Sequence, residues 1–218
     1  MSTDPTTTTA TATTTAALSD KEAQIYDRQI RLWGVDAQQR ISKARVLIYG
    51  MNGLAAEIAK NIVLAGVGSV HLMDHQTVNR SLLGANFLVN ESHLGMNRAL
   101  ASLQSCQELN PLVKVSAEQV SSLGEKLKFD SNDDESVQNA FWSQFTIVLL
   151  CSAGDHASAV TLSDQIKVND ICRKHNIMFF CAETFGLFGL MFQDLINFDY
   201  SIKNPTTKET KSFHKSYV

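Results

Sequence analysis

The sequence predicts a doubly wound α/β domain with a mostly parallel, Rossmann-like sheet. Two observations carry this prediction. Short apolar runs of strand length alternate along the chain with segments of helical periodicity, and a glycine-containing loop follows the first apolar run. That alternation is typical of a parallel sheet wound with helices on both faces. We expect the doubly wound core over residues 45–193, inside a domain that spans residues 19–218.

The individual elements follow from periodicity and from their end signals. The run at 145–151 is the most apolar and predicts a central strand that is buried on both faces. Ser19 and Glu22 have the spacing of a capping box, which marks the start of the first helix. Further strands are expected at 45–49, 70–74, 112–115 and 177–181, and helices at 19–33, 35–42, 54–65, 97–109 and 162–175.

Two segments are expected to lie outside this packed core. Residues 1–18 are threonines and alanines with no large side chain before Leu18, so they predict a disordered tail. Residues 124–136 combine four acidic side chains with two lysines. A docking loop is one interpretation of this segment, and a solvated surface insertion is the favoured one.

Composition excludes several classes of function. The 19 basic and 22 acidic residues give a net charge of −3, which offers no signal for binding nucleic acid. The four cysteines form no metal-binding pair, so no zinc site is expected. No apolar run approaches the ~20 residues that span a bilayer, and residues 1–27 resemble neither a signal nor a transit peptide. We therefore expect the protein in the nucleus and also in the cytoplasm.

The glycine loop is an altered version of a nucleotide-binding loop. A dinucleotide fold uses three small residues after its first strand for a tight turn, close phosphate approach and helix packing. Here Gly50 supplies the turn, Gly53 follows, and Ala55 is small enough for packing, but Asn52 stands where phosphate should approach. Asparagine tolerates a left-handed backbone, so the turn is expected to survive. Asp74 lies near the spacing of a ribose-binding acid, yet we favour a loop that only ends the strand.

Longer segments resemble the activating enzymes of ubiquitin-like proteins, and this resemblance spans residues 19–200. The segments that carry it are Tyr26–Gly34 (YDRQIRLWG), Gly53–Asn61, Gly95–Ala99, Leu109–Pro111 and Phe185–Gly189. The resemblance implies the ThiF/MoeB-type adenylation fold, which bacterial molybdopterin- and thiamine-pathway adenylyltransferases share. In these enzymes two such halves pair, and one of them is degenerate. Within the family the wording is most similar to the smaller subunits that act on SUMO.

The chain is similar to the degenerate half. The second acid of the family's Asp-x-Asp pattern falls on Gln76, its asparagine on Leu82, its Arg-Gln-Phe on residues 85–87, and its lysine on Arg98. Asp155 is offered for the family's magnesium-binding aspartate, without a firm match. The resemblance therefore implies no nucleotide or metal bound by this chain alone, while the assembled enzyme uses ATP and Mg²⁺. It also implies that the domain continues beyond Val218.

Arg28 is the residue for which the resemblance implies a direct role. In the family, this arginine extends from the degenerate half into the ATP site of the larger, catalytic subunit, where a guanidinium neutralises phosphate charge. The implied partners are that larger subunit and, through it, SUMO. From composition alone, Arg28 is equally a surface arginine in a helical charge pattern with Asp27 and Arg31.

Several alternatives stay open. Within the family, the chain could serve another ubiquitin-like protein or form the first half of a ubiquitin-activating enzyme. Outside it stand an NAD-dependent oxidoreductase, which Asn52 disfavours, and a scaffold without a chemical role. Phe185, Phe188 and Phe192 are expected in a turn and strand packed on the core or on a subunit interface, with an aromatic-ligand groove as the alternative. Cys181 is expected to be buried and inert. His71, His75 and His93 are expected to be ordinary polar residues.

Overall fold

A computed structural model describes residues 19–127, 135–153, 160–203 and 210–216. Its main sheet has six strands in the order β3-β2-β1-β4-β5-β6, parallel from β3 to β5, with β6 antiparallel to β5. The predicted doubly wound α/β class is thereby confirmed. The strands are β1 (Arg45–Tyr49), β2 (Ser69–Asp74), β3 (Lys114–Gln119), β4 (Ile147–Ala153), β5 (Met178–Phe185) and β6 (Phe188–Asp194).

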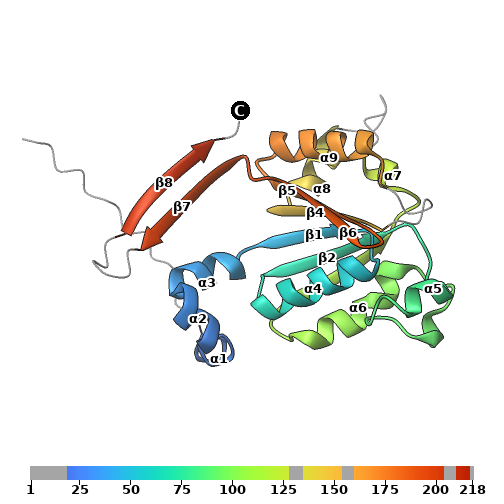
Figure 1. Ribbon diagram of the computed structural model, residues 1–218, viewed down its shortest axis with the longest axis horizontal. Helices are drawn as coiled ribbons and strands as arrows, with labels where there is room; N and C mark the ends of the chain where they lie inside the picture. Colours follow the sequence, from blue (N-terminus) through green and yellow to red (C-terminus); the bar gives the residue numbers. More distant parts are fainter. Residues whose placement is uncertain (1–18, 128–134, 154–159, 204–209, 217–218) are drawn as a thin grey trace, which may run out of the picture.

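Helices cover both faces of this sheet (Figure 1). The main ones are α4 (Gly53–Ala65), α6 (Arg98–Leu109), α7 (Leu123–Leu127), α8 (Glu135–Trp142) and α9 (Leu162–Lys174). Alternate residues of β1 face opposite layers: Val46 and Ile48 pack with α4 and α6, whereas Leu47 and Tyr49 pack with α8 and α9. The two layers bury separate apolar clusters, as period-2 alternation in a two-sided sheet requires.

The remaining elements lie at the ends of this core. They are α1 (Asp20–Ile25), α2 (Asp27–Trp33), α3 (Val35–Ser42), α5 (Arg80–Leu83), a short 3₁₀ helix (Glu91–His93), β7 (Asn197–Lys203) and β8 (Thr210–Ser216). The strands β7 and β8 form a separate antiparallel ribbon that extends away from the sheet in Figure 1. No helix in the described segments is both long and apolar enough to cross a membrane.

The end signals were good predictors of element boundaries. The Ser19–Glu22 capping box forms in both directions, and Gly66 ends α4 with a left-handed backbone (φ +84°). The expected continuous helix over 19–33 is wrong, because Tyr26 interrupts it and separates α1 from α2. The third strand is also misplaced: it begins at Lys114, since Asn110 Oδ1 accepts a hydrogen bond from the Leu112 amide and holds a turn there.

The segment 124–136 is only partly an insertion. Its first residues belong to α7, and its last two begin α8, whose Trp142 is buried under the sheet. Residues 128–134 lie outside the described part of the chain, as do the predicted tail (1–18), Asp155 and Val218.

Candidate functional site

The glycine loop lies at the point where the strand order reverses. Strands β2 and β3 follow on one side of β1, and β4 and β5 on the other. In open α/β sheets, ligands bind outside the carboxyl ends of the strands at this position. Gly50 follows β1 with φ +91°, and a Cβ there would lie 2.2 Å from the Cys151 carbonyl oxygen of β4. Only glycine fits this turn, so the turn expected at Gly50 is confirmed.

Asn52 caps the helix that a nucleotide phosphate would otherwise approach. Its side-chain Oδ1 accepts a hydrogen bond from the Ala55 amide at 3.0 Å, and the side chain is buried. Its backbone is extended (φ −85°, ψ −173°), so the left-handed conformation considered for it is wrong. The left-handed residue is Gly50. An amide of the first turn that could bind phosphate is thus bonded within the chain.

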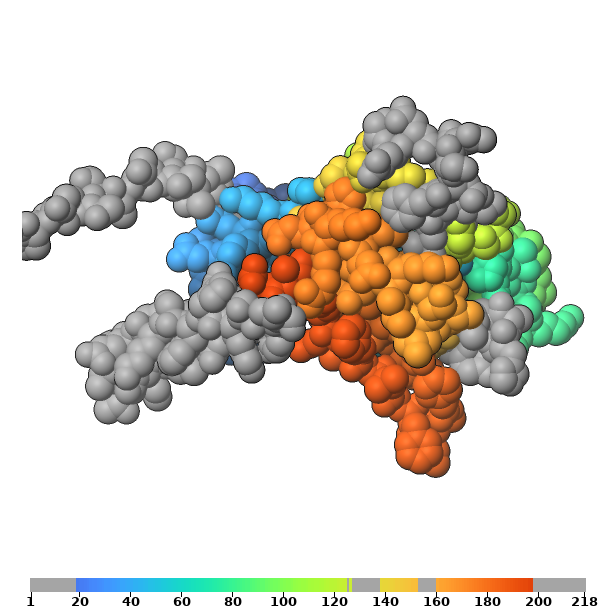
Figure 2. Space-filling model, turned by 90° about the horizontal axis from the view of Figure 1, so that it is seen from above, coloured from blue at the N-terminus to red at the C-terminus, as the bar shows by residue number. Residues whose placement is uncertain are grey.

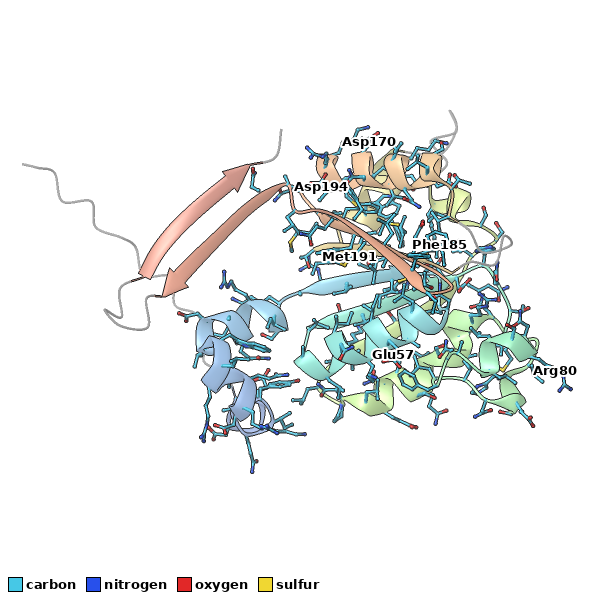
Figure 3. All side chains as sticks on the ribbon, in the orientation of Figure 1. Glu57, Arg80, Asp170, Phe185, Met191 and Asp194 are labelled. Carbon is cyan, nitrogen blue, oxygen red and sulfur yellow. The ribbon has the colours of Figure 1, made fainter. Side chains whose placement is uncertain are left out.

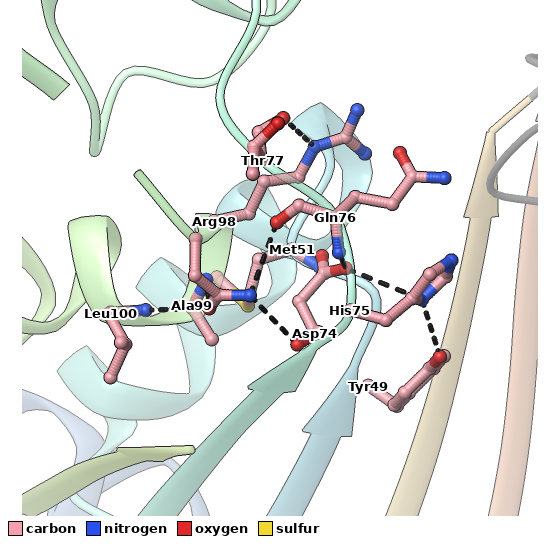
Figure 4. A network of polar contacts seen from close by, with 10 residues as sticks. Tyr49, Met51, Asp74, His75, Gln76, Thr77, Arg98, Ala99 and Leu100 are labelled. Atoms are coloured by element: carbon pink, nitrogen blue, oxygen red, sulfur yellow. Dashed lines mark hydrogen bonds and ion pairs between the residues drawn. The ribbon is translucent and has the colours of Figure 1, made fainter. Parts of the chain in front are cut away.

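Asp74 is bonded to the loop and is not open to a ribose. Its Oδ2 accepts a hydrogen bond from the Met51 amide at 2.6 Å, and its Oδ1 accepts one from the Gln76 amide at 2.8 Å (Figure 4). The residue is 1% exposed. Burial raises the pKa of the Asp74 carboxyl, against the opposing effects of these amides and of the Arg98 charge. The carboxylate therefore fixes the loop to the end of β2.

The segment after α5 closes the loop from outside. Asn86 is buried, and its Nδ2 donates to the Met51 carbonyl at 3.1 Å. A Cβ on Gly53 would lie 2.7 Å from the Ala85 carbonyl oxygen, so this segment packs directly on the loop. Sequence reasoning assigned Asn86 only to a lost motif. Its structural role has no local signal, because the partner is 35 residues away.

The hollow left beside the loop is small. It has a volume of about 190 Å³ and is lined by Asn52, Gly53, Asn79, Ser81, Leu82, Ala85 and Arg98. Small-molecule sites usually occupy roughly 300–1,000 Å³, so the described residues do not enclose a nucleotide. Arg98 is buried, and its Nε donates to the Thr77 carbonyl at 3.1 Å. Its charge thus serves the inside of the loop region.

Arg28 lies at the opposite end of the domain. It follows Tyr26, which is 3% exposed and packs against Gly66 at the end of α4. The Asn110 Nδ2 donates both to Tyr26 Oη at 2.8 Å and to the Val63 carbonyl at 2.9 Å. The glycine loop begins α4 and Gly66 ends it. Since 13 helical residues rise about 20 Å, Arg28 is far from the chain's own loop.

A second contact holds the N-terminal helices in place. Gln38 is fully buried; its Oε1 accepts from the Trp33 indole at 3.1 Å, and its Nε2 donates to the Ala65 carbonyl at 3.0 Å. Tyr26 and Gln38 both fall within the predicted helices, but sequence reasoning missed their anchoring role. A buried tyrosine on an otherwise exposed helix pair would have been the signal, and periodicity alone could not show it.

The Arg28 side chain is exposed and has no hydrogen-bond or ion-pair partner within the described residues. Its neighbours are paired with each other: Arg31 Nε contacts Asp27 at 3.0 Å on the same helix face. The helical charge pattern therefore exists, but Arg28 does not take part in it. A cation that no neighbour neutralises is available to an anion supplied from outside the chain.

No group of three or more His, Cys, Asp or Glu side chains in the described segments could hold a metal ion. His71 contacts Ser116 and Glu118, His75 contacts Tyr49, and His93 accepts from the Asn90 amide. These contacts agree with the expectation of ordinary polar histidines. Cys181 is buried as expected, and burial raises its thiol pKa to about 12.

Comparison with known proteins defines the class. The profile of the ThiF family matches residues 26–210, so the chain belongs to the ThiF family. A crystal structure of selenomethionine PaaA has the same fold, with a TM-score of 0.60 and 18% identity over 88% of this chain and 54% of that one. The ThiF-type fold inferred from the sequence is confirmed.

Curated relatives give a more particular likeness. The chain is 43% identical to SUMO-activating enzyme subunit 1 of Xenopus laevis over 83% of its own length and 47% of that protein. It is 42% identical to the human protein of the same name (82% and 46%), and 39% identical to that of Dictyostelium discoideum (91% and 54%). The chain thus spans about half the length of these relatives.

Proposed function

We propose that this chain serves as the pseudo-adenylating subunit of a heterodimeric, ATP-dependent activating enzyme for SUMO. One observation carries the proposal: the chain bonds its own nucleotide loop internally and leaves Arg28 unpaired about one helix length away. The likeness to relatives named SUMO-activating enzyme subunit 1 supports the choice of modifier. The nucleus, and also the cytoplasm, is the proposed location.

The division of labour follows from charge. In the larger subunit, the carboxylate of the modifier's C-terminal glycine attacks the α-phosphorus of ATP, and pyrophosphate leaves. The modifier is then captured as a thioester on a cysteine of that subunit. Arg28 of this chain reaches the triphosphate from outside and stabilises the negative charge that develops on the leaving pyrophosphate. Mg²⁺ and ATP belong to the larger subunit's site, and this chain holds neither alone.

Arg28→Ala tests the proposal in the assembled heterodimer. We expect single-turnover adenylation at saturating ATP to slow by about tenfold to a thousandfold, because one preorganised charge donor is lost. Arg28→Lys should recover only part of the rate, since an ammonium lacks the planar fork of a guanidinium. Transfer from preformed adenylate to the cysteine should change less, because the triphosphate has already gone.

Arg31→Ala is the matched control. It removes an exposed arginine from the same helix, one turn further on, and should change adenylation less than threefold. Size-exclusion chromatography checks that each variant still assembles. An assembled Arg28→Ala enzyme with the wild-type adenylation rate would reduce the chain to a scaffold. Isolated chain should show no ATP–pyrophosphate exchange.

An NAD-dependent oxidoreductase is the remaining alternative from another class. Its loop would have to admit a pyrophosphate beside Asn52, where the Ala55 amide is already bonded. Titration of isolated chain with NADH, followed by cofactor fluorescence, separates the two ideas. Saturable enhancement in the micromolar range would favour the oxidoreductase.

A further inference from the structure

The hairpin of β5 and β6 exposes apolar side chains that a sheet of this kind normally buries. The register pairs Cys181 with Phe192, Glu183 with Leu190 and Phe185 with Phe188, so the β6 residues share the face that α9 covers on β5. Phe179 and Cys181 on β5 are 1% and 3% exposed, whereas Phe188 and Leu190 are 79% and 60% exposed. Helix α9 does not extend over β6, which leaves this face open. The packing on the core that the sequence suggested for these phenylalanines is therefore wrong.

The end of the hairpin projects from the body of the molecule. Residues 185–190, which we name the apolar finger, contain Leu187, which is fully exposed, and Phe188. Figure 2 shows the orange hairpin protruding beyond the surrounding surface, and Figure 3 places Phe185 near its end and Met191 further along β6. Such a finger has no apolar partner within the described residues that would account for its composition.

An apolar groove lies beside the finger. The α9–β6 groove has a volume of about 430 Å³ and is lined by Leu162, Gln165, Ile166, Asn169, Phe179, Leu190, Met191 and Phe192. None of these side chains carries a charge. A protruding apolar element and an apolar hollow thus stand next to each other on one face.

The size of this surface favours a stable protein interface. With roughly 200 Å² for a fully exposed large apolar side chain, the finger and groove residues together expose on the order of 1,000 Å². Monomeric proteins rarely exceed about 300–600 Å² in one patch, and a standard interface buries about 800 Å² per partner. The surface is large enough to be one side of such an interface.

We infer that the apolar finger and the α9–β6 groove bind the homologous ThiF-type domain of the larger subunit, an inference that rests on the proposed function. A finger beside a groove is self-complementary, so two domains of the same fold related by a pseudo-two-fold axis can each insert a finger into the other's groove. The uncharged lining selects an apolar partner surface and disfavours a charged peptide or nucleic acid. Desolvation of Phe188 and Leu187 in the partner's groove supplies the affinity.

Two variants test this surface through affinity for the purified larger subunit, measured by calorimetry. The double variant Leu187→Asp/Phe188→Asp places charge on the finger, and Ile166→Asp places it in the groove. Each should weaken binding at least about thirtyfold, the loss typical of an interface hot spot. All three positions are more than half exposed, so folding should be retained, as circular dichroism and thermal melting will verify.

Leu100→Asp is the matched control. Leu100 is 42% exposed on α6, on the other face of the sheet, and an acidic residue in the first turn of a helix is favourable. It should bind like the wild type. If wild-type chain fails to bind the larger subunit, the proposed function itself fails. If wild type binds and the finger and groove variants bind within threefold of it, the inference is overturned while the proposed function stands. A stable homodimer that these variants abolish would assign the surface to a second copy instead.

Discussion

The two ends of α4 differ in how their polar groups are used. At its start, Asn52, Asp74 and Asn86 bond the glycine loop to the chain itself. At its end, Tyr26 and Gln38 fix the N-terminal helices, while Arg28 on those helices stays exposed and unpaired within the described residues. The first end retains the form of a nucleotide site with its polar groups committed. The second end has a rigid support and an uncommitted charge.

This difference teaches that loss of a binding loop and retention of a functional arginine are separable in one domain. The side chains at the loop contribute to folding, because removing one leaves buried amides without acceptors. The arginine contributes little to folding, since its side chain is solvated. Stability and activity should therefore respond to different substitutions, and the predictions below test that separation.

Asp74→Ala should have the largest effect on stability. It leaves the buried amide of Met51 and the amide of Gln76 without their acceptor, which costs about 2–3 kcal/mol. Urea denaturation followed by circular dichroism measures this loss, with Arg28→Ala expected within about 0.5 kcal/mol of wild type. Equal losses for the two variants would break the contrast between the two ends. Asp74→Asn, which keeps one acceptor oxygen, should lose less.

Tyr26→Phe should have an intermediate effect. It removes the hydroxyl that accepts from Asn110 but keeps the ring packed against Gly66, so about 1 kcal/mol of stability should be lost. In the heterodimer its effect on adenylation should depend on Arg28, because Tyr26 acts by holding that helix. A double-mutant cycle with Arg28→Ala measures this coupling. Fully additive effects on the rate would show that Tyr26 does not position Arg28.

Local sequence signals predicted much of the fold. Apolar runs located β1, β2, β4 and β5, and the capping box and Gly66 located helix ends to within a residue or two. The third strand was misplaced because β3 is an edge strand of mixed polarity, Lys-Val-Ser-Ala-Glu-Gln, without an apolar run. Helix α8 was missed because its acidic start resembles a solvated loop, although it ends in the buried Trp142.

The candidate site was less predictable than the fold. The sequence placed Gly50, Asn52 and Asp74 near one another, since both belong to the carboxyl edge of neighbouring strands. It could not show that Asp74 accepts from Met51, or that Asn86 closes the loop, because these bonds join residues 23 and 35 positions apart. Likewise, the position of Arg28 far from the loop depends on how Tyr26 packs against the end of α4. The role of Arg28 stays a prediction.

The smallest effect on activity is expected for Cys181→Ala. Cys181 is 3% exposed, and burial raises its thiol pKa to about 12, with Glu183 acting in the same direction. At pH 7.5 the thiolate, which is the reactive form, is therefore about a thousandfold scarcer than for a thiol at its ordinary pKa of 9.0. The other three cysteines are also buried, and burial raises the pKa of each. Adenylation and thioester formation by the Cys181→Ala heterodimer should stay within twofold of wild type. Iodoacetamide should label the native chain far more slowly than the urea-unfolded chain, as mass spectrometry of timed samples will show. Rapid labelling of Cys181 in the native heterodimer, together with lost thioester formation in Cys181→Ala, would place covalent chemistry in this chain.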